Sequence, residues 1–396
     1  MDSDSEYTEV ASFPGHQDAV LSLSFSASGR FLAATGYSGV CVWDVIRKQR
    51  VAIPAPPSTP TTRHIYTRSA WLYFESTGLD VLVLGSQRGD VVLWQWNADD
   101  GVFKYRARAR KSAPDTEVLS IDVYKRNVPA EERGRIAIGT DDGRVAVWSV
   151  AAPDKLRLKF SVQLEPAMRP RTVKFDVASH AVIACSDVGG TIVGLNCQSG
   201  RKIGVRDDGP KVMASVDVDT VKSILVASTG TSFEVLALKK RKHIKTIVSE
   251  MPDVYYPIFV AIGEGGKVLL AGSDKGRALL YDLAQGCIRQ AFDYPKGGLV
   301  QQVATCTTTD FHYVAFAGTS LSQSADVVLY SKKIRVEQST DREAPSAPPA
   351  TTTGATPKMR YIIPAMYWAL MLALLFICYK NTVAVIAINT RNSLSV

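Results

Sequence analysis

One short phrase recurs about every 40 residues along most of this 396-residue chain. Its best copies are GSQRGDVVLW at 85–94 and GTDDGRVAVW at 139–148, and a weaker copy is GSDKGRALLY at 272–281. Each copy reads as a β-strand, a tight turn that contains glycine, and a second strand that ends on an aromatic residue. A unit of this length cannot bury its own apolar face, so the repeats must stack into one body.

Seven repeats fit between the N-terminus and about residue 335. Each opens with an alternating or continuously apolar run, such as 118–123 or 173–177, which is typical of a half-buried strand. The expected fold class is therefore all-β, a seven-bladed β-propeller of four-stranded antiparallel blades. The repeats start near residues 15, 63, 115, 167, 211, 254 and 298.

The seventh repeat lacks a last strand, because the chain becomes polar after Tyr330. The run at residues 7–13 precedes the first repeat and is predicted to supply that strand. Closure of the ring in this way pairs two sheet edges that would otherwise be open to aggregation.

The repeats resemble the WD-repeat family over residues 7–335. The first repeat carries the signature best, with Gly15-His16 about 27 residues before Trp43-Asp44. In that family a histidine, a turn aspartate and the tryptophan form a hydrogen-bonded set inside each blade. Most repeats here lack the Gly-His pair, so we expect strand packing to hold the blades. The structural blade residues that the resemblance implies are His16, Trp43, Asp44, Trp94, Asp142 and Trp148.

A second constraint lies near the C-terminal end, where residues 361–379 carry no charge. A helix of roughly 20 apolar residues crosses a hydrocarbon core of about 30 Å. The alternative, a buried core helix, fits poorly with the preceding Pro/Ser/Thr-rich segment, which has too few large apolar residues to fold. The predicted organisation is a propeller at 1–336, a linker at 337–360, a transmembrane helix at 361–380 and a short tail at 381–396.

The N-terminal ten residues are acidic and contain no apolar segment of the kind found in secretory signals. We therefore expect the propeller to stay in the cytosol and the span to insert after synthesis, as in tail-anchored proteins. The six cysteines have no paired spacing, which suits a reducing compartment. A moderately long span with basic flanks suits the endoplasmic reticulum or the mitochondrial outer membrane, and we favour the endoplasmic reticulum, with the mitochondrial outer membrane as the alternative.

The charge distribution does not favour a nucleic-acid partner. Half of the formal net charge of +8 is carried by basic residues after position 355, and no face of the repeats concentrates the rest. One basic run could contact lipid headgroups, each residue contributing about 1 kcal/mol, although solvated loop charge is the plainer interpretation. This run contains Lys239, Lys240, Arg241 and Lys242.

The sequence contains no catalytic signature. It has no phosphate-binding loop, no nucleophile elbow and no HExxH motif, and its five histidines are scattered. No histidine pairs with Cys, Asp or Glu at metal-ligand spacing. We expect no enzyme activity, no cofactor and no metal.

The leading functional hypothesis is a membrane-tethered protein–protein interaction scaffold, with unidentified protein partners and lipid contact through residues 361–380. The alternative is a guanine-nucleotide exchange factor for a small GTPase. The order of parts resembles the endoplasmic-reticulum exchange factor that loads the GTPase of COPII coats. That family has a Gly-rich, Asn-containing N-terminal segment that helps to form a potassium-binding loop. The first blade here reads SFPGHQDAVLSLSFSASG at 12–29 and lacks it.

Overall fold

The computed structural model describes residues 6–54, 65–110, 113, 115–151, 155–166, 168–238, 242–254, 256–318 and 324–334. The chain divides into two compact units, Met1–Arg335 and Val336–Val396. The predicted linker, transmembrane helix and tail lie outside the described residues. Among the residues described, no helix has the length and apolar character needed to cross a bilayer.

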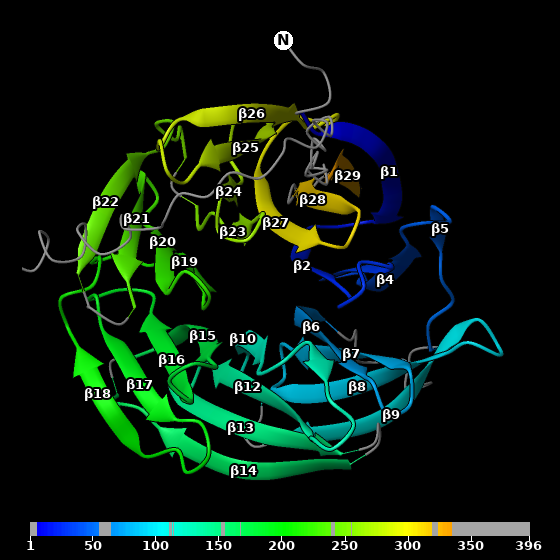
Figure 1. Ribbon diagram of the computed structural model, residues 1–396, viewed down its shortest axis with the longest axis vertical. Coiled ribbons are helices and arrows are strands. Elements are labelled where there is room, and N and C mark those ends of the chain that lie inside the picture. Colours follow the sequence, from blue (N-terminus) through cyan, green and yellow to red (C-terminus); the bar gives the residue numbers. More distant parts are fainter. Residues whose placement is uncertain are drawn as a thin grey trace, which may run out of the picture. The chain divides into compact units, whose positions relative to one another are not determined.

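Seven sheets are arranged as a ring in the described part of the chain, which confirms the predicted seven-bladed propeller (Figure 1). The inner strands begin a few residues after the predicted repeat starts. From the inner strand outward, blade 1 contains β2 (Val20–Phe25), β3 (Phe31–Gly36), β4 (Gly39–Asp44) and β5 (Gln49–Arg50). Blade 2 contains β6 (Tyr66–Phe74), β7 (Leu79–Ser86), β8 (Asp90–Asn97) and β9 (Val102–Arg110). Blade 3 contains β10 (Val118–Val123), β12 (Gly134–Thr140), β13 (Arg144–Ala151) and β14 (Lys155–Gln163).

The remaining blades follow the same order. Blade 4 contains β15 (Pro170–Asp176), β16 (Ala181–Ser186), β17 (Ile192–Asn196) and β18 (Lys202–Arg206). Blade 5 contains β19 (Ser215–Asp219), β20 (Ile224–Ser228), β21 (Ser232–Ala237) and β22 (His243–Val248). Blade 6 contains β23 (Val260–Gly263), β24 (Val268–Ala271), β25 (Arg277–Asp282) and β26 (Ile288–Asp293). Blade 7 contains β27 (Val300–Thr307), β28 (Phe311–Gly318), β29 (Ala325–Lys333) and β1 (Thr8–His16).

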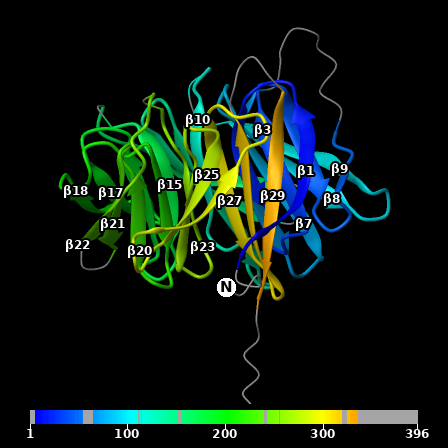
Figure 2. The ribbon, with the colours of Figure 1, turned by 90° about the horizontal axis from the view of Figure 1, so that it is seen from above.

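The N-terminal strand closes the ring, as the sequence predicted. β1 pairs antiparallel with β29, so that Phe13 lies opposite Val327, and the two strands run side by side in Figure 2. Phe13 is buried and stacks on Trp43 of blade 1, with ring centroids 5.4 Å apart. At the other end, the Tyr7 N–H donates to Gln290 Oε1 at 3.0 Å, and the Gln290 amide donates back to the Tyr7 carbonyl at 2.8 Å. The chain start is thus bonded to blades 1, 6 and 7.

The glycine that opens the repeated phrase marks a close approach between neighbouring blades. A Cβ on Gly139 would lie 2.7 Å from the Pro170 carbonyl oxygen, where the inner strand of blade 4 begins. At Gly272 it would lie 2.0 Å from the Val300 carbonyl oxygen, where blade 7 begins. Any side chain would force the blades apart. The phrase therefore recurs because each of these second strands must pass close to the next blade.

Adjacent inner strands are held together by short polar side chains. The Ser120 hydroxyl accepts the Val173 N–H at 2.9 Å, and the Asp122 carboxylate accepts the Phe175 N–H at 2.7 Å. Asp217 accepts the Ile262 N–H in the same way at 2.8 Å. In the bonds made by Ser120 and Asp122, the partner lies 53 residues further along the chain in both cases. The two strands therefore advance together, so neighbouring inner strands run in the same direction. We call the face where they begin the upper face and the face where they end the lower face.

One strand was not predicted. The segment after β10 folds back over blade 2, where β11 (Asn127–Val128) pairs in parallel with residues 73–74 of β6. Blade 2 keeps the predicted four antiparallel strands, β6 to β9, and β11 adds a fifth strand at the edge of its sheet. The buried Val128 anchors the segment against the apolar side of blade 3.

Candidate interaction site in the central channel

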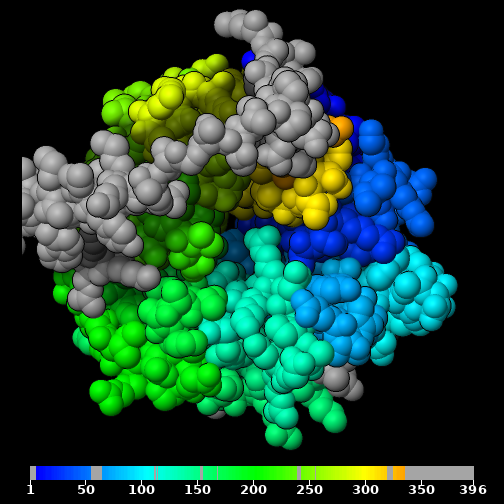
Figure 3. Space-filling model, viewed as in Figure 1, coloured from blue at the N-terminus to red at the C-terminus, as the bar shows by residue number. Residues whose placement is uncertain are grey.

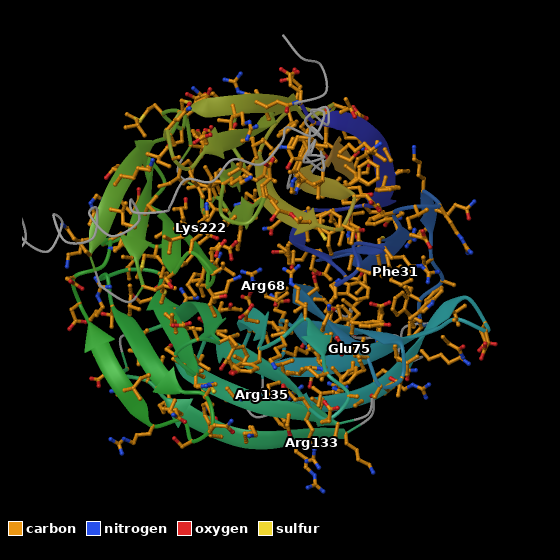
Figure 4. The ribbon with its side chains drawn as sticks, viewed as in Figure 1. Phe31, Arg68, Glu75, Arg133, Arg135 and Lys222 are labelled. Atoms are coloured by element: carbon orange, nitrogen blue, oxygen red, sulfur yellow. The ribbon has the colours of Figure 1, made fainter. Side chains whose placement is uncertain are left out.

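The inner strands place two arginines and one aromatic ring together at the upper mouth of the channel. Arg68 lies on β6 and Arg171 on β15, each close to the start of its strand. Phe259 comes from the segment just before β23. The guanidinium carbons of Arg68 and Arg171 lie 5.0 and 5.5 Å from the centroid of the Phe259 ring. Figure 4 shows Arg68 near the centre of the ring. Figure 3 views the molecule from the opposite, lower face, which is also hollowed at the centre of the ring.

Arg68 is fixed by the backbones of three blades. Its Nε donates to the Leu119 carbonyl at 2.6 Å, and its Nη1 donates to the carbonyls of Leu21 at 3.0 Å and Thr67 at 2.5 Å. Arg171 is held more loosely, by one bond of 3.4 Å from Nε to the Ala214 carbonyl. These acceptors are neutral, so they orient the two guanidinium groups without cancelling their charge.

Neither arginine forms an ion pair with a residue that the structure describes. Burial and the neighbouring Arg171 lower the pKa of Arg68 to about 9, which leaves it protonated at neutral pH. Burial likewise lowers the pKa of Arg171. Two like charges in a confined mouth favour an incoming anion, because the low-dielectric walls concentrate their field.

Arg169, at the upper rim, differs from this pair because its charge is already matched. Its guanidinium lies 2.6 Å from an Asp141 carboxylate oxygen and 3.1 Å from one of Asp187. These two carboxylates come from turns of blades 3 and 4. The rim therefore has two carboxylates for one arginine, whereas Arg68 and Arg171 lie deeper and form no ion pair with a described residue, although Glu117 acts on both from a distance.

A second charged layer lies further along the channel, where Lys174 of blade 4 stands between two carboxylates. Its Nζ is 2.8 Å from Asp217 of blade 5 and 3.9 Å from Asp122 of blade 3. Burial alone would lower the pKa of Lys174, but the attraction of both carboxylates outweighs it and raises that pKa. Burial raises the pKa of Asp122 despite the nearby Lys174. This layer links three blades, and its two carboxylates share one cation.

The predicted blade residues of the first repeat are buried but do not form the expected hydrogen-bonded set. His16 Nε2 bonds to the Ala34 carbonyl at 3.1 Å, while Nδ1 has no partner, and burial lowers the pKa of His16 to about 4. Trp43 stacks on Phe13 instead of contacting the histidine through a polar bond. Asp44 accepts the backbone N–H of Arg47 at 2.9 Å and so closes the turn after β4.

The later predicted residues are also local structural elements. Trp94 and Trp148 are buried on β8 and β13. Asp142 accepts a hydrogen bond of 2.6 Å from the Thr140 hydroxyl within the turn between β12 and β13. None of these side chains lies at the channel mouth. Of the basic run, Lys239, Lys240 and Arg241 lie outside the described residues, and Lys242 is exposed in the turn before β22, on the lower face.

One cluster contains the residue types of a hydrolase but not their geometry. On blade 5, Glu234 accepts bonds from the Ser232 hydroxyl at 2.8 Å and from His243 Nε2 at 2.7 Å. The serine donates to the carboxylate and not to the imidazole, so the histidine cannot act as its base. Among the described residues, no group of His, Cys, Asp and Glu is arranged to hold a metal ion.

The sequence pattern did not single out Arg68 and Arg171, because each is a lone arginine near the start of a largely apolar strand. The available signal was a cation at an alternating position of an inner strand, as in the segments YTRSAW at 66–71 and PRTVKF at 170–175. In a ring of such strands, alternate residues face the axis. A positive charge at that position therefore points into the channel.

The comparison with known families agrees with the propeller fold. Residues 7–44 match the WD40 family, described as WD domain, G-beta repeat. The matched stretch contains β1 to β4, so it begins on the outer strand of blade 7 and continues into blade 1. No curated protein is matched by the chain. The match in the first repeat and the seven-bladed ring together support a WD-repeat β-propeller.

Proposed function

We propose that this protein is a membrane-tethered scaffold that binds protein partners at the upper mouth of its channel. WD-repeat propellers typically bind other proteins. The observation that carries the proposal is the pair formed by Arg68 and Arg171, two oriented cations without an ion-pair partner among the described residues. An acidic side chain of a partner would meet both guanidinium groups through charge-assisted hydrogen bonds, with Phe259 covering its apolar stem.

Arg171 provides the sharper test, because Arg68 also ties three blades together and its loss would disturb the fold. We expect Arg171→Gln to weaken partner binding by about tenfold, since it removes one charge-assisted contact. Arg201→Gln is the matched control: it removes the same charge from an exposed turn on the lower face of blade 4. Proximity labelling from the full-length chain in cells, repeated for each variant, identifies the partners. A labelled set that is identical for Arg171→Gln and the wild type contradicts the proposed mouth.

The tether is the second half of the proposal. The uncharged run at 361–379 and the Pro/Ser/Thr-rich segment before it support a cytosolic propeller held at an intracellular membrane. We favour the endoplasmic reticulum, with the mitochondrial outer membrane as the alternative. Residues 356–396 fused to a fluorescent protein should be sufficient for membrane targeting. A diffuse signal would contradict tethering while leaving the channel proposal intact.

A further inference from the structure

A basic pocket of about 440 Å³ opens between blades 3 and 4. It is separate from the channel mouth, because its lining includes none of Arg68, Arg171 and Phe259. The segment between β10 and β12 supplies much of that lining. Four cationic side chains and one carboxylate line it: Lys125, Arg133, Arg135, Lys159 and Glu132. The formal charge of this lining is +3. Figure 4 shows Arg133 and Arg135 over blade 3, away from Arg68 at the centre.

Arg135 is held in place by an aromatic side chain. Its guanidinium carbon lies 3.6 Å from the centroid of the Tyr124 ring, within the range of a cation–π contact. The Tyr124 ring is buried, and its hydroxyl bonds to His180 Nδ1 of blade 4 at 2.9 Å. The Tyr124 N–H donates to the Arg135 carbonyl at 3.0 Å. A cation positioned in this way loses little conformational entropy when it binds a ligand.

The segment that carries Arg133 is also anchored. Its β11 pairs with β6 of blade 2, and the Glu75 N–H donates to the Val128 carbonyl at 3.0 Å. Within it, the Glu132 N–H donates to the Pro129 carbonyl at 3.0 Å. The pocket therefore has a preformed wall, and the basic residues on that wall keep their spacing without a ligand.

The cations of the pocket are only partly neutralised. Lys125 pairs with Glu132 at 2.6 Å, and Lys159 donates to the neutral Gln198 Oε1 at 2.8 Å. Arg133 and Arg135 form no ion pair with a residue that the structure describes. A phosphate monoester carries about −1.5 to −2 charges and accepts bidentate bonds from guanidinium groups, so it matches this lining in both charge and geometry. We propose that the pocket binds a phosphate monoester.

The position of the pocket indicates where such a phosphate comes from. β10 ends at Val123, directly before Tyr124, and β29 ends at Lys333. Successive strands of a blade are antiparallel, so first and third strands run in the same direction and both of these ends lie on the lower face. The pocket thus opens on the face from which the chain continues toward residues 361–379. A phosphorylated lipid headgroup is the source that this arrangement favours, and this choice of source rests on the proposed membrane tether.

Calorimetric titration of the full-length chain in neutral detergent micelles tests the pocket. The probes are inorganic phosphate, inositol 1,4,5-trisphosphate and short-chain phosphatidylinositol 4-phosphate, with short-chain phosphatidylcholine as the neutral comparison. We expect saturable binding of the phosphate esters, weakened about tenfold by Arg133→Gln. Arg47→Gln is the matched control, because Arg47 is exposed in another turn of the lower face, and it should change nothing.

The outcomes separate the claims. Tighter binding of the lipid than of the inositol phosphate supports a headgroup, and equal binding supports the phosphate chemistry but overturns the lipid source. Absence of saturable binding by any phosphate, or equal weakening by Arg133→Gln and Arg47→Gln, overturns the pocket itself. Micelles require no insertion into a bilayer, so failure of the tether in cells leaves this result unaffected.

Discussion

Lys174 offers the strongest single test of how the blades are held together at the channel. Its ammonium group lies between Asp122 and Asp217, whose carboxylates also bond to backbone N–H groups of the following inner strands. Replacement by methionine keeps the length of the side chain but leaves two carboxylates facing each other without a cation. Removal of one partner from a fully buried ion pair costs about 3–5 kcal/mol.

The partial exposure of the three side chains places the expected effect below that range. The side chain of Lys174 is 28% exposed, and those of Asp122 and Asp217 are 22% and 19% exposed. Water therefore screens part of the interaction, and we expect Lys174→Met to lower the free energy of unfolding by about 2 kcal/mol. For a propeller of this size the melting temperature should fall by roughly 3 °C.

The assay is thermal and denaturant unfolding of the full-length protein followed by circular dichroism. Lys275→Met, at an exposed site on the upper face, is the control and should leave the transition unchanged. Adding Asp217→Asn to Lys174→Met should recover part of the loss, because it removes one of the two orphaned carboxylates. If Lys174→Met melts within the error of the wild type, the charged layer does not hold the blades and the reasoning is wrong.

Three further predictions follow from the structure. Burial raises the pKa of Asp80 to about 6, above its unfolded value of about 3.9, so ionised Asp80 destabilises the fold above pH 6 and this cost disappears as the pH falls toward 4. Asp80→Asn should therefore raise the free energy of unfolding by about 2 kcal/mol at pH 7 and by little at pH 4, and a gain independent of pH would contradict this. Phe13→Ala should lower the free energy of unfolding by about 3 kcal/mol in denaturant titrations, because the ring is buried against Trp43; an unchanged midpoint would mean that β1 does not close the ring. If the exchange-factor alternative holds, the full-length protein at micromolar concentration should accelerate nucleotide release from the GTPase of COPII coats, and an unchanged rate removes it.

The seven-bladed ring could be predicted from the sequence because the strand–turn–strand phrase recurs along the chain. The approach of the next blade requires the glycine at Gly139 and Gly272, whereas blades 4 and 5, which also lack the aromatic end of the phrase, carry Cys185 and Ala227 at the corresponding position. The closing strand at residues 7–13 was predictable because the last repeat was one strand short. These features can be read from short segments of the sequence or from the number of strands in each repeat.

The site was not predictable in the same way, because its contacts join residues that are distant in sequence. Arg68 and Arg171 meet at Phe259 only after three blades have been placed around the axis. The two-residue strand β11 has no alternating pattern, and its pairing with β6 depends on how the segment folds back. The family motif at His16 implied a polar set with a tryptophan and a turn aspartate, but no motif specifies the bond that the side chain makes to the Ala34 carbonyl.

The most direct test of the account is the location and accessibility of the propeller in sealed organelles. Full-length protein in intact microsomes should stay with the membrane pellet through alkaline carbonate. Protease added from outside should then remove the propeller and leave only a small membrane-embedded fragment. Release of the full-length protein by carbonate, or protection of the propeller from the protease, would contradict a cytosolic scaffold held at a membrane.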